Sequence, residues 1–192
     1  MKISAILMAS GFSARMGENK LLLPYQGKPL LSHAADVIAA MDFYQFIIVI
    51  TKENAAGLRF SPKAQIVWNP HPEEGQSRSV RLGTEHASGD GYMFFPADQP
   101  FLDTASIRQL LSAARADNIA VPTVDGIAGS PVFFGKRFRE ELLAVTGDSG
   151  GRTVKKNHPE SCCYVEMKNK RLFRDIDTAE QYHALLEESV SD

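Results

Sequence analysis

The sequence predicts an α/β fold, a single three-layer domain spanning residues 1–192 around a mostly parallel sheet. Short apolar runs alternate with segments of helical period, which is typical of strands and helices that follow one another in a parallel sheet. The run at residues 46–50 (FIIVI) is apolar throughout, as expected for a strand covered on both faces. A length of 192 residues suffices for one domain with a sizeable core and is short for two.

The apolar runs predict the strands. Asn169 is the natural turn residue between the last two of them. A glycine-rich turn precedes residues 129–134, so we expect that run to pair as a hairpin or as an edge strand. The predicted strands, in order, are residues 3–9, 46–50, 65–68, 91–96, 119–124, 129–134, 164–167 and 172–173.

Helical spacing of apolar residues predicts the helices between these strands. Pro29 is expected at the first helical position, where the missing N–H of proline removes no helical hydrogen bond. Asp103 precedes a helical segment and is a candidate N-cap. The predicted helices are residues 29–39, 77–87, 104–116, 136–145 and 178–188.

Composition argues against several classes of protein. The formal net charge of -2 provides no overall positive field to attract nucleic acid or an anionic membrane, so a polyanionic substrate needs a locally arranged positive site. No apolar run approaches the ~20 residues that span a bilayer, and no signal peptide is evident, so we expect a cytoplasmic protein. The histidines lack zinc-ligand spacing. The adjacent Cys162 and Cys163 do not favour a disulfide.

The loop after the first predicted strand has the residues of a phosphate cradle. Ala9, Ser10 and Gly11 are small enough to let backbone N–H groups approach an anion closely. Arg15 can grip phosphate oxygens as a planar fork, and Lys20 adds a point charge for a second phosphate. A triphosphate carries about four negative charges, so two cations and a metal would complement it.

Two well-known phosphate motifs do not match this loop. A Walker loop needs G-x-x-x-x-G-K-[ST], but the interval from Gly11 to Gly17 is too long and Lys20 is misplaced. A dinucleotide fingerprint needs a second glycine two residues after Gly11, where this chain has Ser13. From the residues alone, an ordinary solvated turn remains the alternative.

The segment after residues 65–68 offers groups that suit a nucleoside. Gly75 permits close backbone approach to a planar base, and Ser77 or Ser79 offers a hydroxyl to a ribose or a base edge. The alternative is that these residues only cap a helix. Further along, the glycine-rich turn before Arg152 could bind a phosphate, or Asp148 could cap a helix there with Arg152 solvated.

Two acidic segments are candidates for a magnesium site. Asp98 follows an apolar strand near the phosphate loop, where one or two carboxylates plus substrate phosphates would satisfy Mg²⁺. Alternatively, Asp98 caps the following turn. Asp175 and Asp177 lie on one face of an extended segment, and Asp177 could complete the metal site opposite Asp98. The competing reading is that Asp177 or Thr178 caps the last helix.

Several segments together resemble the NTP-transferase family that includes the molybdenum-cofactor cytidylyl- and guanylyltransferases. ASGFSARMGENKLLLP resembles the family loop A-A-G-x-S-x-R-M-G-x-x-K-x-x-x-P and departs from it at Ser10. N-P-x-x-x-x-G-x-x-x-S, D-Q-P, G-x-P-V, G-D-x-G and D-I-D-T follow in family order over nearly the whole chain. Ala97 stands where glycine is usual, and Ser130 replaces the usual His or Asn in the segment that the resemblance expects to line the acceptor site.

The resemblance implies a Rossmann-like αβα nucleotidyltransferase fold and in-line attack by an acceptor phosphate on the α-phosphorus of an NTP. The implied catalytic residues are Arg15, Lys20 and Asp98, and the implied metal ligands are Asp98 and Asp177. The implied binding residues are Ala9, Ser10, Gly11, Arg15, Lys20, Asn69, Gly75 and Ser79 for the nucleotide, and Ser130, Pro131 and Arg152 for the acceptor.

The D-Q-P and D-I-D-T segments favour the branch that uses CTP and transfers CMP to molybdopterin, with Mg²⁺ as cofactor and pyrophosphate as product. A recipient molybdoenzyme is a possible further partner, whereas nucleic acid and membrane are not expected. A GTP-using molybdopterin guanylyltransferase and a sugar- or polyol-phosphate nucleotidyltransferase remain as alternatives. So does a protein of another class, a non-catalytic molybdenum-cofactor carrier or insertion factor.

Overall fold

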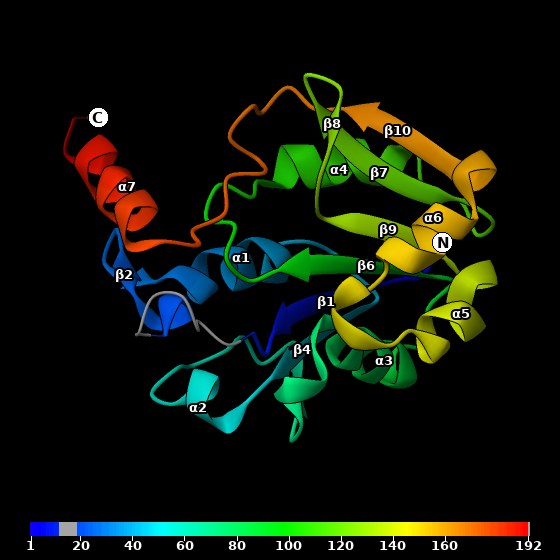
Figure 1. Cartoon of the computed structure of the whole chain (residues 1–192), viewed down its shortest axis with the longest axis horizontal. Helices are drawn as coiled ribbons and strands as arrows, with labels where there is room; N and C mark the ends of the chain where they lie inside the picture. Colours follow the sequence, from blue (N-terminus) through cyan, green and yellow to red (C-terminus); the bar gives the residue numbers. More distant parts are fainter. Residues whose placement is uncertain (12–18, 192) are drawn as a thin grey trace.

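One large sheet runs through the middle of the molecule (Figure 1), and the computed structural model describes residues 1–11 and 19–191. The spatial strand order is β10-β7-β9-β6-β1-β4-β5, with β8 paired beside β7. Only β9 and β8 run antiparallel to their neighbours in the described sheet, so the predicted mostly parallel sheet is confirmed. The strands are β1 (Ile3–Ala9), β4 (Gln45–Ile50), β5 (Ala64–Trp68), β6 (Gly91–Pro96), β7 (Ile119–Val124), β8 (Ile127–Ala128), β9 (Val132–Gly135) and β10 (Cys162–Glu166).

Helices cover both faces of this sheet and complete three layers. Alternate strand residues face opposite sides: Leu7 packs in one core cluster with α1 and α4, and Ile6 packs in the other with α3, α5 and α6. No helix among the described residues is long and apolar enough to cross a membrane. The helices are α1 (Leu30–Ala39), α2 (Lys52–Ala55), α3 (Gln76–His86), α4 (Thr104–Ser112), α5 (Arg139–Ala144), α6 (Arg152–Asn157) and α7 (Ala179–Ser191).

Strand order places a switch point between β1 and β6. The chain passes from β1 to β4 and β5 on one side, then crosses to β6 on the other side of β1. Both strands run parallel, with Met8 opposite Pro96, so their carboxyl ends lie at the same edge. In open α/β sheets, ligands bind in the crevice at such a point. The predicted phosphate loop and Asp98 follow these two strands.

The chain returns to the first loop at its C-terminal end. A small apolar cluster joins Ile176 and Leu185 to Tyr25 and Leu30, and Figure 1 shows α7 beside β2 (Pro24–Tyr25). The Tyr182 hydroxyl also donates a 2.6 Å hydrogen bond to a backbone carbonyl of β2, which pairs with β3 (Lys28–Pro29). This docking places the segment before α7 next to residues that follow β1.

Two predicted strands differ from the structure. Residues 132–135 form β9, which pairs antiparallel with the preceding strand β7, as the hairpin alternative expected. It also pairs with β6 and is therefore internal rather than an edge strand. Phe133 and Phe134, which point to opposite faces of the sheet, are both buried, so both faces of β9 are covered. Residues 172–173 are a turn instead of a strand, because the Leu172 N–H bonds back to the Asn169 carbonyl at 3.2 Å.

Several helix ends also differ. Residues 136–138 form a 3-10 turn before α5, and the last helix continues to Ser191 instead of ending at residue 188. Pro29 belongs to β3, where it pairs with Pro24 of β2. It therefore precedes the first helix in an extended conformation, with ψ of 145°. The helix predicted for residues 104–116 ends at Ser112, where the Asn118 side chain bonds the backbone of Ala113 and Arg115 and turns the chain back.

Candidate active site

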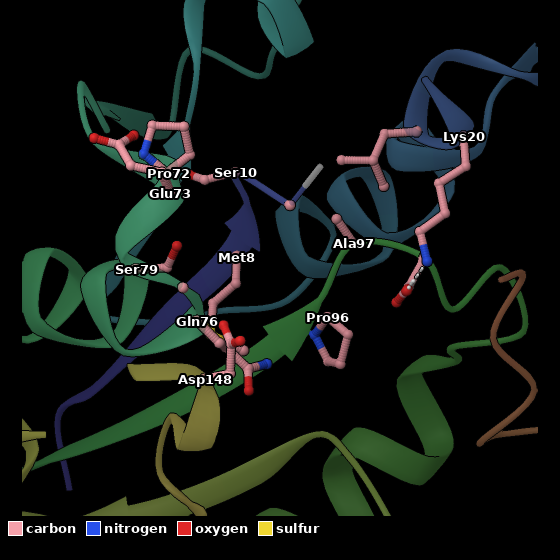
Figure 2. A pocket seen from close by; sticks show the side chains of 14 residues that line it. Met8, Ser10, Lys20, Pro72, Glu73, Gln76, Ser79, Pro96, Ala97 and Asp148 are labelled. Carbon is pink, nitrogen blue, oxygen red and sulfur yellow. Dashed lines mark hydrogen bonds and ion pairs between the residues drawn. The ribbon is translucent and has the colours of Figure 1, made fainter. Parts of the chain in front are cut away.

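A cleft of about 450 Å³ opens at the switch point between β1 and β6 (Figure 2). Its lining comes from the segments after β1 and β6, the start of α3 and the turn at 147–149, which are far apart in the sequence. A volume of this size suits a nucleotide-sized ligand. The cleft brings together six of the residues predicted for nucleotide and metal, which are Ser10, Gly11, Lys20, Gly75, Ser79 and Asp98.

The first residues of the phosphate loop are small because they are packed at the end of the sheet. Ala9 is fully buried, behind the cleft lining. Ser10 is 4% exposed, and its hydroxyl donates to the Val49 carbonyl of β4 at 3.1 Å. The Ser10 side chain is therefore engaged by the sheet, so any contact with an anion falls to its backbone. Arg15, the other predicted cation of this loop, lies outside the described residues.

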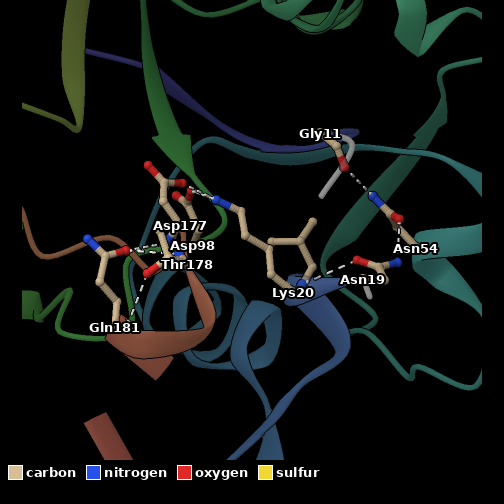
Figure 3. Close-up of polar contacts among 9 residues, drawn as sticks. Gly11, Asn19, Lys20, Asn54, Asp98, Asp177, Thr178 and Gln181 are labelled. Carbon is tan, nitrogen blue, oxygen red and sulfur yellow. Dashed lines mark hydrogen bonds and ion pairs between the residues drawn. The ribbon is translucent and has the colours of Figure 1, made fainter. Parts of the chain in front are cut away.

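The Lys20 side chain points toward two neighbouring aspartates, Asp98 and Asp177, that come from distant parts of the chain (Figure 3). Its ammonium is 2.8 Å from Asp98 Oδ2 and 2.6 Å from Asp177 Oδ1. Burial lowers the pKa of Lys20, but the charge of Asp98 and the hydrogen bonds that the ammonium donates to both carboxylates outweigh this effect and hold the pKa above its usual value. Lys20 is therefore a cation at neutral pH.

The last helix is capped by Thr178, which leaves Asp177 to face Lys20. The Thr178 hydroxyl accepts a hydrogen bond from the Gln181 N–H at 3.3 Å, and the Gln181 side chain accepts from the backbone N–H groups of Asp177 and Thr178 at 2.7 and 3.0 Å. This reciprocal arrangement fixes the turn that carries Asp177. Of the two readings that the sequence left open, the structure assigns capping to Thr178.

The acidic residues around Lys20 have the chemistry of a divalent cation site. Burial raises the pKa of Asp175, and the negative charges of Asp177 and Asp98 raise it further, so negative charge is concentrated here. Among the described residues, no group of three or more His, Cys, Asp or Glu side chains is arranged to hold a metal. Two carboxylates nevertheless fit Mg²⁺, which takes its other ligands from water and substrate phosphates.

Gly75 is at a position that accepts no side chain. Its φ is 82°, and an added Cβ would lie 2.1 Å from Asp148 Oδ1 and 3.0 Å from the Gly147 carbonyl carbon. The Gly150 N–H donates to the Ser77 hydroxyl at 3.1 Å, so the turn at 147–150 is tied to the start of α3. Asp148 consequently lines the same cleft as Gly75 and Ser79.

Asn69, like Ala9, was predicted for the nucleotide but does not line the cleft. It is 4% exposed, and its Oδ1 accepts from the His71 N–H at 3.1 Å. This contact shapes the turn between β5 and the cleft. The Asn69 Nδ2 is buried without a hydrogen-bond partner among the described residues.

A second cavity of about 300 Å³ adjoins the cleft, and the two share Met8 and Gln76 in their linings. Ser130 and Arg152, both predicted for the acceptor, line it, whereas Pro131 is buried and does not. Lys155 lines it as well, three residues after Arg152 on α6. A cavity with two cationic side chains suits an anionic ligand.

Sequence reasoning missed several lining residues. Lys155 could have been found, because residues three apart on a helix share a face. Asp148 was considered only as a helix cap. No local sequence pattern marks Met8 and Gln76 as functional, because what distinguishes them is their position in the linings of both cavities.

Comparisons with known proteins show which family this chain is similar to. The family model described as MobA-like NTP transferase domain matches residues 5–162. Purine catabolism protein PucB of Bacillus subtilis is 29% identical, over 92% of each chain. A Paenarthrobacter nicotinovorans protein named nicotine blue oxidoreductase is 25% identical over 96% of each. Molybdenum cofactor cytidylyltransferase of Escherichia coli is also 25% identical, over 94% of this chain and 93% of the relative.

Guanylyltransferases occur among the relatives too, such as the probable molybdenum cofactor guanylyltransferase of Bacillus cytotoxicus, 25% identical over 96% of each chain. Among solved structures, Rv0371c of Mycobacterium tuberculosis superposes with a TM-score of 0.81 at 24% identity, over 97% of this chain and 98% of that one. The same protein has been solved as a manganese complex. The family match covers most of the sequence and spans the residues that form the cleft, and this chain therefore belongs to the MobA-like NTP transferase domain family of nucleotidyltransferase enzymes.

Proposed function

We propose that this protein transfers CMP from CTP to the phosphate of molybdopterin or the molybdenum cofactor, with Mg²⁺ as cofactor and pyrophosphate as the released product. The observation that carries the proposal is the junction of two cavities at Met8 and Gln76. One cavity contains Lys20 and Asp98, and the other contains Arg152 and Lys155. Transfer between two phosphorylated substrates requires such neighbouring sites for donor and acceptor.

The residues would act mainly by positioning and by stabilising charge. Lys20 and the backbone from Ser10 to Gly11 would hold the triphosphate, and Arg15 of the same loop is proposed to assist. Asp98 and Asp177 would hold Mg²⁺, which when bound supplies neutralisation of phosphate charge. The acceptor phosphate is itself the nucleophile, so the proposal requires no nucleophile from the protein.

The remaining predicted residues would orient the two substrates. Gly75 and Ser79 face the cleft and would seat the nucleoside, whereas Asn69 would support that segment from behind. In the second cavity, Ser130 and Arg152 would contact the acceptor. Pro131 would shape the segment that presents Ser130.

We favour CTP as the donor nucleotide, because the D-Q-P and D-I-D-T segments resemble the cytidylyl branch of the family most. A GTP-using guanylyltransferase and a sugar- or polyol-phosphate nucleotidyltransferase are the alternatives within the same reaction class. A non-catalytic carrier has less support, because the family is one of enzymes and Lys20, Asp98 and Asp177 converge as a working site would need.

Pyrophosphate release from each of the four NTPs with Mg²⁺ tests the proposal, using molybdopterin and, separately, sugar and polyol phosphates as acceptors. We expect release from CTP with molybdopterin. Release from GTP would change the base assignment, and release only with a sugar or polyol phosphate would change the acceptor. Cofactor binding without any pyrophosphate would indicate a carrier and refute transferase activity.

Asp98→Ala tests the metal assignment. We expect kcat to fall by about 10³-fold with the fold intact, because a carboxylate that positions charge at the reacting phosphates is lost. Asp36→Ala is the control, since Asp36 lies on the exposed face of α1. Comparable activity of the two variants would show that Asp98 is not at the reaction centre.

Arg152→Ala tests the acceptor cavity separately from the nucleotide cleft. We expect the KM for the acceptor to rise roughly 10–100-fold, as for loss of a charged hydrogen bond, with the KM for the nucleotide unchanged. The matched control is Lys156→Ala, which removes an exposed cation of the same helix. A rise in the nucleotide KM instead would place Arg152 on the donor side.

A further inference from the structure

A buried asparagine outside the cleft lining connects the two ends of the phosphate loop. Asn54 is 5% exposed and lies in α2, whose start is capped by Thr51. Its Nδ2 donates to the Ala9 carbonyl at 2.6 Å and to the Gly11 carbonyl at 3.4 Å. Its Oδ1 accepts from Asn19 Nδ2 at 2.7 Å. One amide thus holds the chain both as it leaves β1 and as it reaches Lys20 (Figure 3).

The contact with Asn19 continues to the turn that presents Lys20. Asn19 is the N-cap of η1 (Lys20–Leu22), and its Oδ1 accepts from the Leu21 N–H at 3.2 Å. Since Asn54 holds the other end of the same amide, Asn19 is fixed in the orientation that caps the turn. The Lys20 ammonium then reaches Asp98 and Asp177 on the opposite side.

The Asn54 backbone is fixed independently of these contacts. Its N–H donates to Thr51 Oγ1 at 3.1 Å, and Thr51 is itself 4% exposed. The position of the amide is therefore set by β4 and α2, not by the loop that it holds. Such a buried amide, with both its donor and its acceptor used, is suited to fix a distance between two segments.

We propose that Asn54 is a positioning residue, which sets the separation of the Gly11 backbone and the Lys20 ammonium and so determines affinity for the triphosphate of the nucleotide. The inference rests on the proposed function, because it assumes that the cleft binds an NTP. Asn54 does not touch the cleft, so its contribution is to hold the cradle in the binding geometry before the ligand arrives. The acceptor side does not depend on it.

Asn54→Ala and Asn19→Ala, alone and together, test this role. We expect each single variant to raise the KM for the NTP and the Kd of inorganic triphosphate with Mg²⁺ by about tenfold, the effect of one neutral hydrogen bond. The acceptor KM should stay unchanged. The double variant should lose less than the product of the two singles, because both belong to one hydrogen-bonded chain.

Asn118→Ala is the matched control. Asn118 also makes two hydrogen bonds from its side chain to the backbone, at 2.9 Å each, but at the end of α4 and away from the cleft. If Asn54 were merely structural, Asn54→Ala would lose stability as the control does and keep full affinity for triphosphate. That result would overturn the proposal. Asn19 is only partly buried, so Asn19→Ala keeps the test available if Asn54→Ala does not fold.

Hydrogen exchange in the free protein separates this inference from the proposed function. The Leu21 amide should exchange faster in Asn54→Ala than in wild type, because its acceptor on Asn19 is no longer held. Absence of triphosphate binding by the wild type would defeat the proposed function but would leave this measurement valid. Unchanged exchange of Leu21 would show that Asn54 does not order the Lys20 turn.

Discussion

Two glycines with positive φ angles allow the effect of packing around the cleft to be measured. Gly75 has φ of 82° and Gly57 has φ of 75°, so alanine is strained at both positions. An added Cβ meets nothing within 4 Å at Gly57, whereas at Gly75 it would lie 2.1 Å from Asp148 Oδ1. Gly57→Ala therefore reports the cost of a positive φ alone. Gly75→Ala adds the displacement of Asp148 and the cost of a ψ of -173°, which at positive φ is essentially restricted to glycine.

We expect Gly57→Ala to lower the free energy of unfolding by about 1–2 kcal/mol, the cost of a left-handed alanine. Gly75→Ala should lower the free energy of unfolding by at least as much as Gly57→Ala. Part of the clash can be relieved by rotating the Asp148 carboxylate, but the Gly147 carbonyl carbon at 3.0 Å is backbone and must shift with its turn. Because Gly75 and Asp148 both line the cleft, we expect nucleotide affinity to fall about tenfold in Gly75→Ala only.

Urea unfolding and nucleotide binding with Mg²⁺ provide the two measurements. In the double variant Gly75→Ala with Asp148→Ala, stability should recover in part, because the carboxylate is removed while the contact with the Gly147 carbonyl carbon and the backbone cost remain. Equal stability and unchanged nucleotide affinity for both single variants would refute the close approach of Gly75 to the turn at 147–149.

Two further predictions concern side chains whose hydrogen bonds are internal. Ser10→Ala should lower the free energy of unfolding by about 1 kcal/mol in urea titrations and leave the Kd for NTP unchanged, because the hydroxyl bonds the β4 backbone; a large loss of NTP affinity would contradict this. Asp103→Ala removes the N-cap of α4 and should cost about 1 kcal/mol at pH 7. Burial raises the pKa of Asp103, but hydrogen bonds from Ser106 and Asn169 outweigh this effect and hold the pKa below its usual value. The stabilisation by the Asp103 carboxylate is therefore present above the unfolded pKa of about 4 and is lost as the pH falls through the folded pKa. The stability gap to wild type, measured by urea unfolding from pH 7 to pH 3, should therefore narrow below pH 4; a constant gap would show that the carboxylate charge is not involved.

Elements with strong local signals were predictable from the sequence. The bounds predicted for β1, β6 and β7 agree with the structure, because a run of apolar residues between polar turns is sufficient to specify a buried strand. The hairpin-type pairing of residues 132–135 with β7 was one of two expected outcomes, but the second neighbour, β6, was not predicted, because no local pattern tells which strands will flank a run. The helix starting at Thr104 was found from its cap, and its end was missed because it depends on Asn118, several residues beyond.

The sequence by itself determined the family, the alternation of strands and helices, and six of the residues that line the cleft. It did so because glycine, capping and apolar patterns are local, and because the signature segments stand in family order. Only the tertiary structure decided which side chains meet. Lys20 pairs with Asp177 across 157 positions, and Asn54 reaches Asn19 across 35. Those contacts follow from the strand order and from the docking of α7, which bring distant segments within hydrogen-bond distance. The spacing of residues along the chain encodes neither of them.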